Sequence, residues 1–91
     1  MMDFQTFKEK IKTIKVVYSV SRNIPYKICS IQGNILTIHR ESTDKDSEID
    51  LQELYEFYKN ENRYTTTNAK KYGLDYAQSP SVAIIKELTR S

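Results

Sequence analysis

The sequence predicts a compact α+β domain with an N-terminal helix, a central antiparallel β-hairpin and two or three C-terminal helices. Three observations lead there: a helical apolar stripe near the N-terminus, a β-branched stretch folded at Gly33-Asn34, and a helix-start signal at Asp50. Residues 16–20 are able to add a third strand, and a winged-helix-like arrangement is one form of this fold. A length of 91 residues predicts a single domain over residues 1–91.

The first predicted helix lies in the stretch DFQTFKEKIKTI. Its apolar residues recur at steps of three or four and therefore share one face: Phe4, Phe7, Ile11 and Ile14. Asp3 is suited to the N-cap position, because its carboxylate can accept a hydrogen bond from a free backbone amide. The next residues, VVYSVS, either extend this helix or form a short strand, and the pattern leaves both open.

The stretch YKICSIQGNILTIHR predicts a β-hairpin. Two runs rich in Ile, Tyr and Thr flank Gly33-Asn34, a pair suited to a two-residue turn with positive backbone angles. This turn places Ile31 opposite Leu36 on an apolar face. Both faces of the hairpin carry apolar residues, so we expect helices to cover at least one of them.

The same register makes further predictions toward the open end of the hairpin. It places Cys29 opposite Ile38 on the core face, where a free cysteine behaves as a small hydrophobic residue. Lys27 and Arg40 would lie side by side, and His39 would lie on the face opposite Cys29. A nucleophilic Cys–His pair is therefore not expected.

A polar, acidic stretch, ESTDKDSE, follows the hairpin and is expected to be a loop. The second helix then begins at Asp50, which forms a capping box with Glu53, while Ile49 and Leu54 form the accompanying hydrophobic staple. The apolar positions of this helix predict a buried stripe of Leu51, Leu54, Tyr55 and Tyr58.

The C-terminal third predicts a short helix within NENRYTTTNAKKYG, ended by Gly73, and a longer last helix. Ser79 is expected to cap the last helix, with Pro80 at its first position. Two helices in this order raise the question of a helix-turn-helix that reads DNA. The last helix offers few polar side chains near its start, so we expect a core helix with a basic edge: Lys86, Arg90, Ala83 and Glu87 share its outer side.

Composition narrows the functional classes. Cys29 and His39 are the single members of their residue types, so no zinc-ligand set is available, and the two glycines do not provide a phosphate-binding loop. We therefore expect neither catalytic residues nor a metal, cofactor or small-molecule substrate. The lack of an apolar run of 18 residues and of a signal-peptide pattern predicts no membrane partner and a cytoplasmic location.

The charges are segregated along the chain. Residues 1–40 hold seven Lys or Arg against two acids, residues 41–62 eight acids against two Lys, and residues 63–91 five Lys or Arg against two acids. These blocks either form opposed basic and acidic faces or neutralise each other. The basic blocks predict a non-catalytic module that contacts DNA or RNA phosphates through Lys8, Lys12, Lys15, Lys27, Arg40, Lys70 and Lys71. The alternative is a protein-interaction or assembly module, in one form a homodimer.

Three stretches together, IPYKICSIQGNILTIHR, IDLQELYEFY and SPSVAIIKEL, resemble small α+β accessory modules found beside restriction endonucleases and mobile-element nucleases. The resemblance covers residues 24–88. It implies a nucleic-acid-handling context but transfers no functional residue, because every matching position is one that makes the fold.

Overall fold

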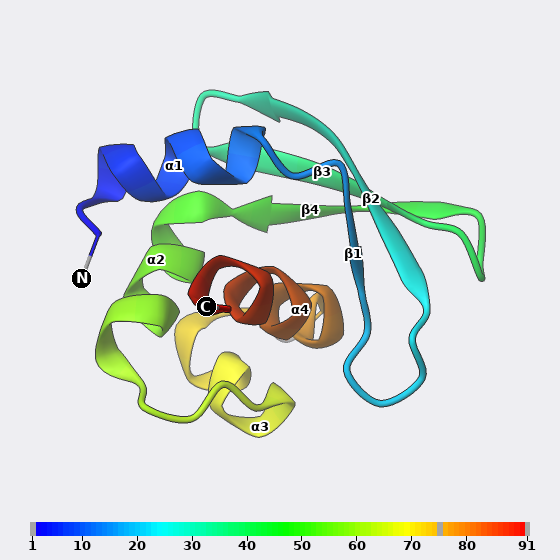
Figure 1. Cartoon of the computed structure of the whole chain (residues 1–91). Helices are drawn as coiled ribbons and strands as arrows, with labels where there is room; N and C mark the ends of the chain where they lie inside the picture. The colour runs from blue at the N-terminus through cyan, green and yellow to red at the C-terminus, as the bar shows by residue number, and fades with distance from the viewer. Residues whose placement is uncertain (1, 75, 91) are drawn as a thin grey trace.

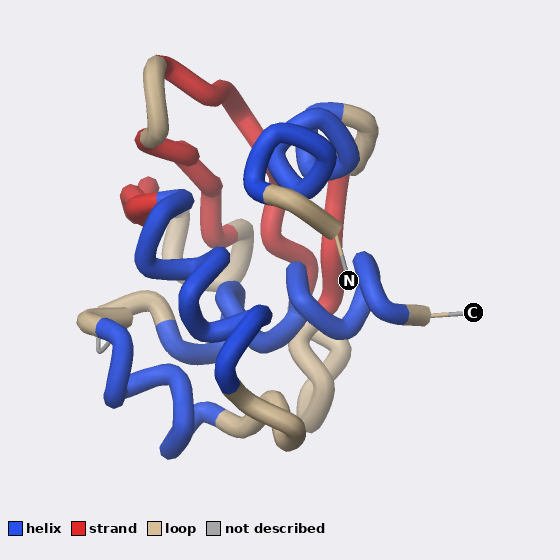
Figure 2. Tube along the Cα trace, turned by 90° about the vertical axis from the view of Figure 1, so that its left-hand side faces the viewer, coloured by secondary structure: helices blue, strands red, loops and turns tan. Residues whose placement is uncertain are grey.

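A computed structural model describes residues 2–74 and 76–90 and has the predicted α+β architecture (Figure 1). Its strands form one antiparallel sheet in the order β1-β2-β3-β4, and the helices and one face of the sheet enclose the core (Figure 2). The elements in chain order are α1 (Phe4–Lys12), β1 (Val16–Tyr18), β2 (Pro25–Gln32), β3 (Ile35–Arg40), β4 (Lys45–Asp50), α2 (Leu51–Asn60), α3 (Thr66–Ala69), the 3-10 helix η1 (Lys70–Tyr72) and α4 (Gln78–Thr89).

The residues after the first helix form the strand β1 and do not extend the helix. Val17 pairs with Tyr26 of β2, and the side chains of both residues are buried. The chain therefore leaves α1 at Thr13 and returns as a third strand beside the predicted hairpin.

Strand β4 corrects the prediction of an acidic loop after the hairpin. Lys45–Asp50 pairs with β3 over its whole length, from Arg40 opposite Lys45 to Ile35 opposite Asp50. Ile49 is the one buried residue of this strand. A strand at the edge of a sheet with one face in water needs few apolar residues, and its charges oppose pairing with another sheet edge.

The β2–β3 hairpin turns where the sequence predicted, with Ile31 opposite Leu36. Gly33 has the expected positive φ, 62°, whereas Asn34 does not. The register then shifts between Ile28 and Ser30, so that Ile28 faces Ile38. Cys29 is the extra residue of this β-bulge, and its side chain is exposed. The prediction of a core thiol was therefore wrong.

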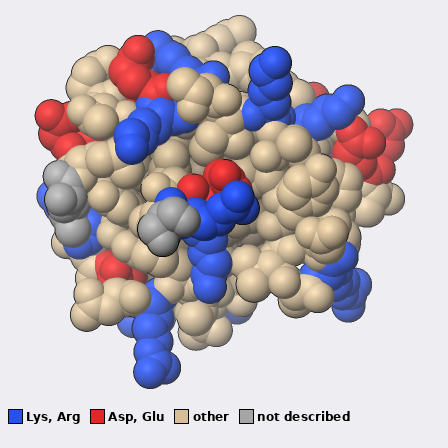
Figure 3. Space-filling model, viewed as in Figure 1, with Lys and Arg blue, Asp and Glu red and all other residues tan. Residues whose placement is uncertain are grey.

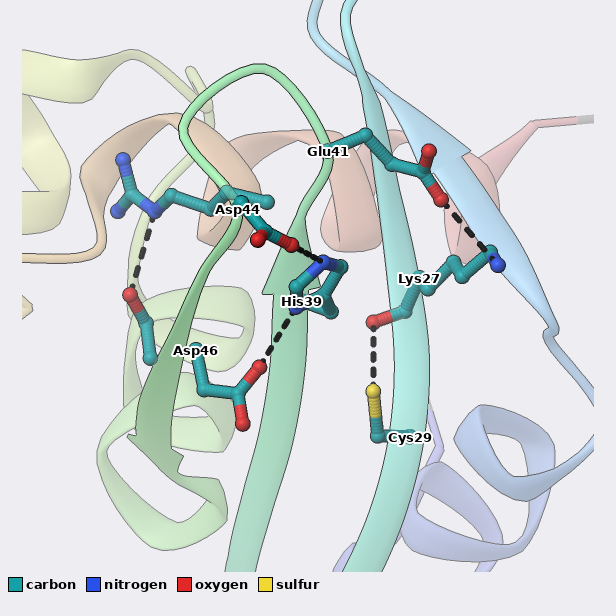
Figure 4. A network of polar contacts seen from close by, with 8 residues as sticks. Lys27, Cys29, His39, Glu41, Asp44 and Asp46 are labelled. Atoms are coloured by element: carbon teal, nitrogen blue, oxygen red, sulfur yellow. Dashed lines mark hydrogen bonds and ion pairs between the residues drawn. The ribbon is translucent and has the colours of Figure 1, made fainter.

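The bulge also changes the pairing beyond it. Lys27 lies opposite His39, and Arg40 lies opposite Tyr26, so Lys27 and Arg40 are not the predicted neighbours. Cys29 and His39 project from the same open face of the sheet (Figure 4), which corrects the expectation of opposite faces. One inserted residue reverses the alternation of side chains along the rest of the strand.

The predicted helix caps are present on α1 and α2. The carboxylate of Asp3 accepts a hydrogen bond from the Thr6 amide at 2.8 Å, and that of Asp50 accepts from the amides of Gln52 and Glu53 at 2.8 and 3.2 Å. These bonds satisfy backbone amides that have no partner within the helix. Both helix starts are therefore determined by local sequence.

The start of α4 differs from the prediction. The helix begins at Gln78 with Ala77 as its N-cap, and no side chain caps it. The hydroxyl of Ser79 pairs instead with the Tyr26 hydroxyl at 3.0 Å, and Pro80 occupies the third helical position. A tertiary hydrogen bond to β2 thus replaces the expected local one.

The core joins all the larger elements. On α2, Phe57 is buried and Tyr55 only half-buried, which corrects one position of the predicted stripe. The Phe7 ring of α1 packs against the rings of Tyr55 and Tyr58, with centroids 5.2 Å apart in both pairs. The fully buried side chains of the core include Phe7, Ile11, Leu36, Ile38, Ile49, Leu51, Leu54, Phe57, Leu74, Ile84 and Ile85.

Candidate nucleic-acid interface

Four adjoining depressions form a row along α4 and the end of α1. Neighbouring depressions share lining residues: Ile14 between the first and second, Glu87 and Arg90 between the second and third, and Val20 and Lys86 between the third and fourth. We call this row the basic furrow. The residues that define it here are Lys10, Lys12, Ile14, Lys15, Tyr18, Val20, Lys86, Glu87 and Arg90.

The walls of the furrow come from α1, α4 and the loop between β1 and β2. The last turn of α1 and the residues that follow it form one end, and the loop between β1 and β2 faces the outer side of α4. Ala83, Lys86, Glu87 and Arg90 line a single depression. Lys86, Glu87 and Arg90 are exposed there, as the sequence predicted, whereas Ala83 is buried in the core, which corrects its predicted place on the outer side. The spacing of three and four residues on α4 therefore becomes one wall of the furrow.

The furrow carries an excess of positive charge. Five cations line it, and Glu87 is its single acid among the described residues. Two of the cations have acidic neighbours: Lys12 Nζ lies 2.9 Å from Glu9 Oε2, and Arg90 Nη1 lies 3.5 Å from Glu87 Oε1.

The other three cations are free to meet an external anion. Lys10, Lys15 and Lys86 are exposed and form no ion pair with any residue in the described ranges. Figure 3 shows the face on which α4 ends, with Lys and Arg side chains spread along it and acidic atoms beside the central group.

Of the seven cations predicted from the sequence, Lys12 and Lys15 line the furrow. Lys8 lies on the same helix, but its ammonium donates a hydrogen bond to the Asn34 side chain at 3.2 Å. Lys27 lies on β2 and forms an ion pair with Glu41 at 3.2 Å.

Arg40 is engaged within the domain. Its guanidinium donates from Nη2 to the backbone oxygen of Tyr76 at 2.9 Å and from Nε to Ser47 Oγ at 3.2 Å. The same group lies 5.8 Å from the centre of the Tyr26 ring. These contacts tie β3 to β4 and to the segment before α4, so the position of Arg40 is that of a structural anchor.

Lys70 and Lys71 lie in η1, next to α3, at the opposite end of the molecule from α1 (Figures 1 and 2). Lys71 Nζ lies 3.9 Å from Glu61 Oε2. The seven predicted cations therefore do not converge on one surface.

Lys10, Lys86 and Arg90 are furrow residues outside the predicted set. Helical periodicity places Lys86 and Arg90 four residues apart on the outer side of the last helix, which is a usable signal. The meeting of that side with the end of α1 and with the β1–β2 loop depends on tertiary packing, so no local pattern contains it.

The last helix is not available to read DNA bases as the second helix of a helix-turn-helix. Residues Pro80 to Ile85 are all buried, so the N-terminal half of α4 packs inside the domain. A recognition helix must expose that half to the major groove. The basic edge predicted for α4 is present at its C-terminal end, where the exposed side chains of Lys86 and Arg90 line the furrow.

The open face of the sheet carries the other polar cluster (Figure 4). His39 lies between two carboxylates, with Nδ1 2.7 Å from Asp46 and Nε2 3.1 Å from Asp44. The hydrogen bond to Asp46 is the main cause of a pKa raised above that of an ordinary histidine. The Cys29 thiol, on the same face, donates to the Lys27 carbonyl oxygen at 3.8 Å.

Metal-ligating side chains do not gather in groups of three or more within residues 2–74 and 76–90. None of the helices there is long and apolar enough to cross a membrane. Comparisons with protein-family models, curated proteins and solved structures gave no match. The resemblance to nuclease-associated accessory modules therefore stays a prediction.

Proposed function

We propose that this domain is a non-catalytic nucleic-acid-associated module that contacts phosphates through the basic furrow. The observation that supports the proposal is the charge of the furrow: five lining cations against Glu87 alone among the described residues, with Lys10, Lys15 and Lys86 in no ion pair there. Cations that have no acidic neighbour keep their full attraction for an external anion.

Phosphate contact needs only positive charge within reach of the backbone, whereas base reading needs several polar side chains aimed at base edges. The furrow supplies the first property. We therefore expect binding with little sequence preference and with a strong dependence on salt, because each neutralised phosphate releases a bound counterion.

The experiment compares two triple variants that remove the same charge. The first is Lys10→Gln, Lys15→Gln and Lys86→Gln in the furrow, and the second is Lys45→Gln, Lys59→Gln and Lys70→Gln outside it. Fluorescence anisotropy with a labelled oligonucleotide at 50 and 200 mM salt gives the affinity and its salt dependence. We expect the furrow triple to reduce the slope of log K against log salt by about two to three. The second triple should change it little.

Three results would overturn the proposal: no binding at 50 mM salt, an affinity that does not change with salt concentration, or an equal loss of affinity in the two triple variants. Poly-glutamate, which is negatively charged like the oligonucleotide, serves as a competitor. If it displaces the oligonucleotide at equal charge concentration, a protein-interaction module with an acidic partner explains the furrow better.

A further inference from the structure

We infer that the nucleic acid bound in the basic furrow is single-stranded, with one base stacked on Tyr18. This inference rests on the proposed function and goes beyond it by naming the strandedness of the ligand. The observation that supports the inference is the position of one aromatic ring. Tyr18 lines the same depression as Lys86 and Arg90.

Tyr18 is exposed where a core function would bury it. Its side chain is 51 % exposed on the outer side of β1, whereas the neighbouring Val17 is buried in the core. An exposed ring beside cations is the arrangement that single-strand-binding proteins use, because every base has a face that can stack on it. The cations then hold the phosphates that flank the stacked base.

A duplex cannot use this ring. Inside a duplex each base face is covered by the next base pair, so no face is open to Tyr18 unless the strand is unpaired or the base is flipped out. Duplex readers instead insert a helix or a β-ribbon into the major groove. The N-terminal half of α4 is buried and cannot do so.

The size of the depressions agrees with a single strand. The depression that holds Tyr18 has a volume of about 230 Å³, and the others range from about 300 to about 460 Å³. Small-molecule sites begin at about 300 Å³. Three of the depressions reach this size, and the depression beside Tyr18 is the narrowest part of the row.

Hydroxyl groups extend the furrow beyond Lys86. Ser21 and Thr66 line the fourth depression, and no hydrogen bond of either hydroxyl occurs within the described residues. Hydroxyls of this kind donate to phosphate and sugar oxygens without reading sequence. They continue the path of the strand past the last cation.

The test measures fluorescence anisotropy at 50 mM salt with a labelled twelve-nucleotide oligo-dT and with a labelled twelve-base-pair duplex. The variants are Tyr18→Leu, which keeps apolar bulk without a flat ring, and Tyr18→Phe, which keeps the ring. Tyr76→Leu is the matched control, because Tyr76 is 60 % exposed and lies outside the furrow. Circular dichroism verifies that each variant is folded.

We expect the natural chain to bind oligo-dT more tightly than the duplex. Tyr18→Leu should weaken oligo-dT binding about 5- to 150-fold with an unchanged salt slope, and Tyr18→Phe and Tyr76→Leu should bind like the natural chain. Equal or tighter duplex binding overturns the inference and leaves the proposed function intact. Full oligo-dT affinity in Tyr18→Leu also overturns it. Failure of both ligands to bind removes the proposed function as well.

Discussion

The His39 imidazole and the Asp46 carboxylate form a cross-strand pair, with Nδ1 2.7 Å from Oδ1. Asp44 lies in the turn between β3 and β4 and has a φ of 54°. Its Oδ1 is 3.1 Å from Nε2, the other ring nitrogen of His39. The imidazole therefore joins β3, β4 and their turn, and it does so most strongly when it carries a proton.

This pair predicts how stability depends on pH. The folded state raises the pKa of His39, chiefly through the hydrogen bond to Asp46 and further through the charges of Asp44 and Glu41. A raised pKa means that the folded state binds the proton more tightly than the unfolded state. The contribution is complete below the unfolded pKa of about 6.5 and is lost as the pH rises through the folded value.

Thermal unfolding of the natural chain and of His39→Gln measures this effect at pH 5.5, 6.5 and 8.5. The natural chain should have the higher Tm at pH 5.5, and the difference should shrink toward pH 8.5. A difference in Tm that stays constant with pH would contradict the prediction.

The two glycines predict unequal costs of substitution by alanine. Both have positive φ, 62° at Gly33 and 81° at Gly73, which costs an alanine about 1–2 kcal/mol. At Gly33 a Cβ would meet nothing within 4 Å, whereas at Gly73 it would lie 2.5 Å from Glu53 Oε2. Gly73→Ala should therefore lower the free energy of unfolding by at least as much as Gly33→Ala in urea denaturation, because the flexible end of the Glu53 side chain must also move.

The double variant Glu53→Ala with Gly73→Ala isolates the clash. It should lose less than the two single losses added together, because the small side chain at residue 53 removes the obstacle. Strict additivity would show that the Glu53 side chain moves aside at no cost.

Two buried serines should respond in opposite ways to loss of their hydroxyl. Ser81 Oγ is fully buried and has no hydrogen-bond partner within the described residues, so Ser81→Ala should leave stability unchanged or raise it by about 1 kcal/mol. Ser19 Oγ accepts from the amides of Arg22 and Ile24 at 3.3 and 2.9 Å. Ser19→Ala should cost about 1–3 kcal/mol in the same chemical denaturation. A loss at Ser81 as large as that at Ser19 would mean that the Ser81 hydroxyl has a partner.

Substitution of Arg40 tests whether this residue stabilises the fold or binds phosphate. Arg40→Gln removes the charged donor of the bond to the Tyr76 backbone oxygen, and we expect a loss of about 1–3 kcal/mol in the free energy of unfolding. Oligonucleotide affinity, measured well below the Tm, should change by less than about twofold for a residue that makes no phosphate contact. A large loss of affinity with unchanged stability would restore Arg40 to the interface.

The sequence by itself determined the features that depend on neighbouring residues. The caps at Asp3 and Asp50, the turn at Gly33 and the end of the short helix at Gly73 all rest on hydrogen bonds or backbone angles within a few residues. The apolar stripe of α1 and the outer side of α4 are also local, because they follow from helical periodicity. These features were enough to predict the α+β class.

Tertiary structure alone decided β4, the bulge at Cys29 and the furrow. β4 is held by pairing with β3, so its polar composition gives no signal, and a bulge breaks the two-residue repeat from which register is predicted. The furrow joins side chains from α1 to those of α4, about seventy residues apart in the chain. Local propensity cannot encode such a meeting, because it depends on how the buried faces of both helices pack in one core.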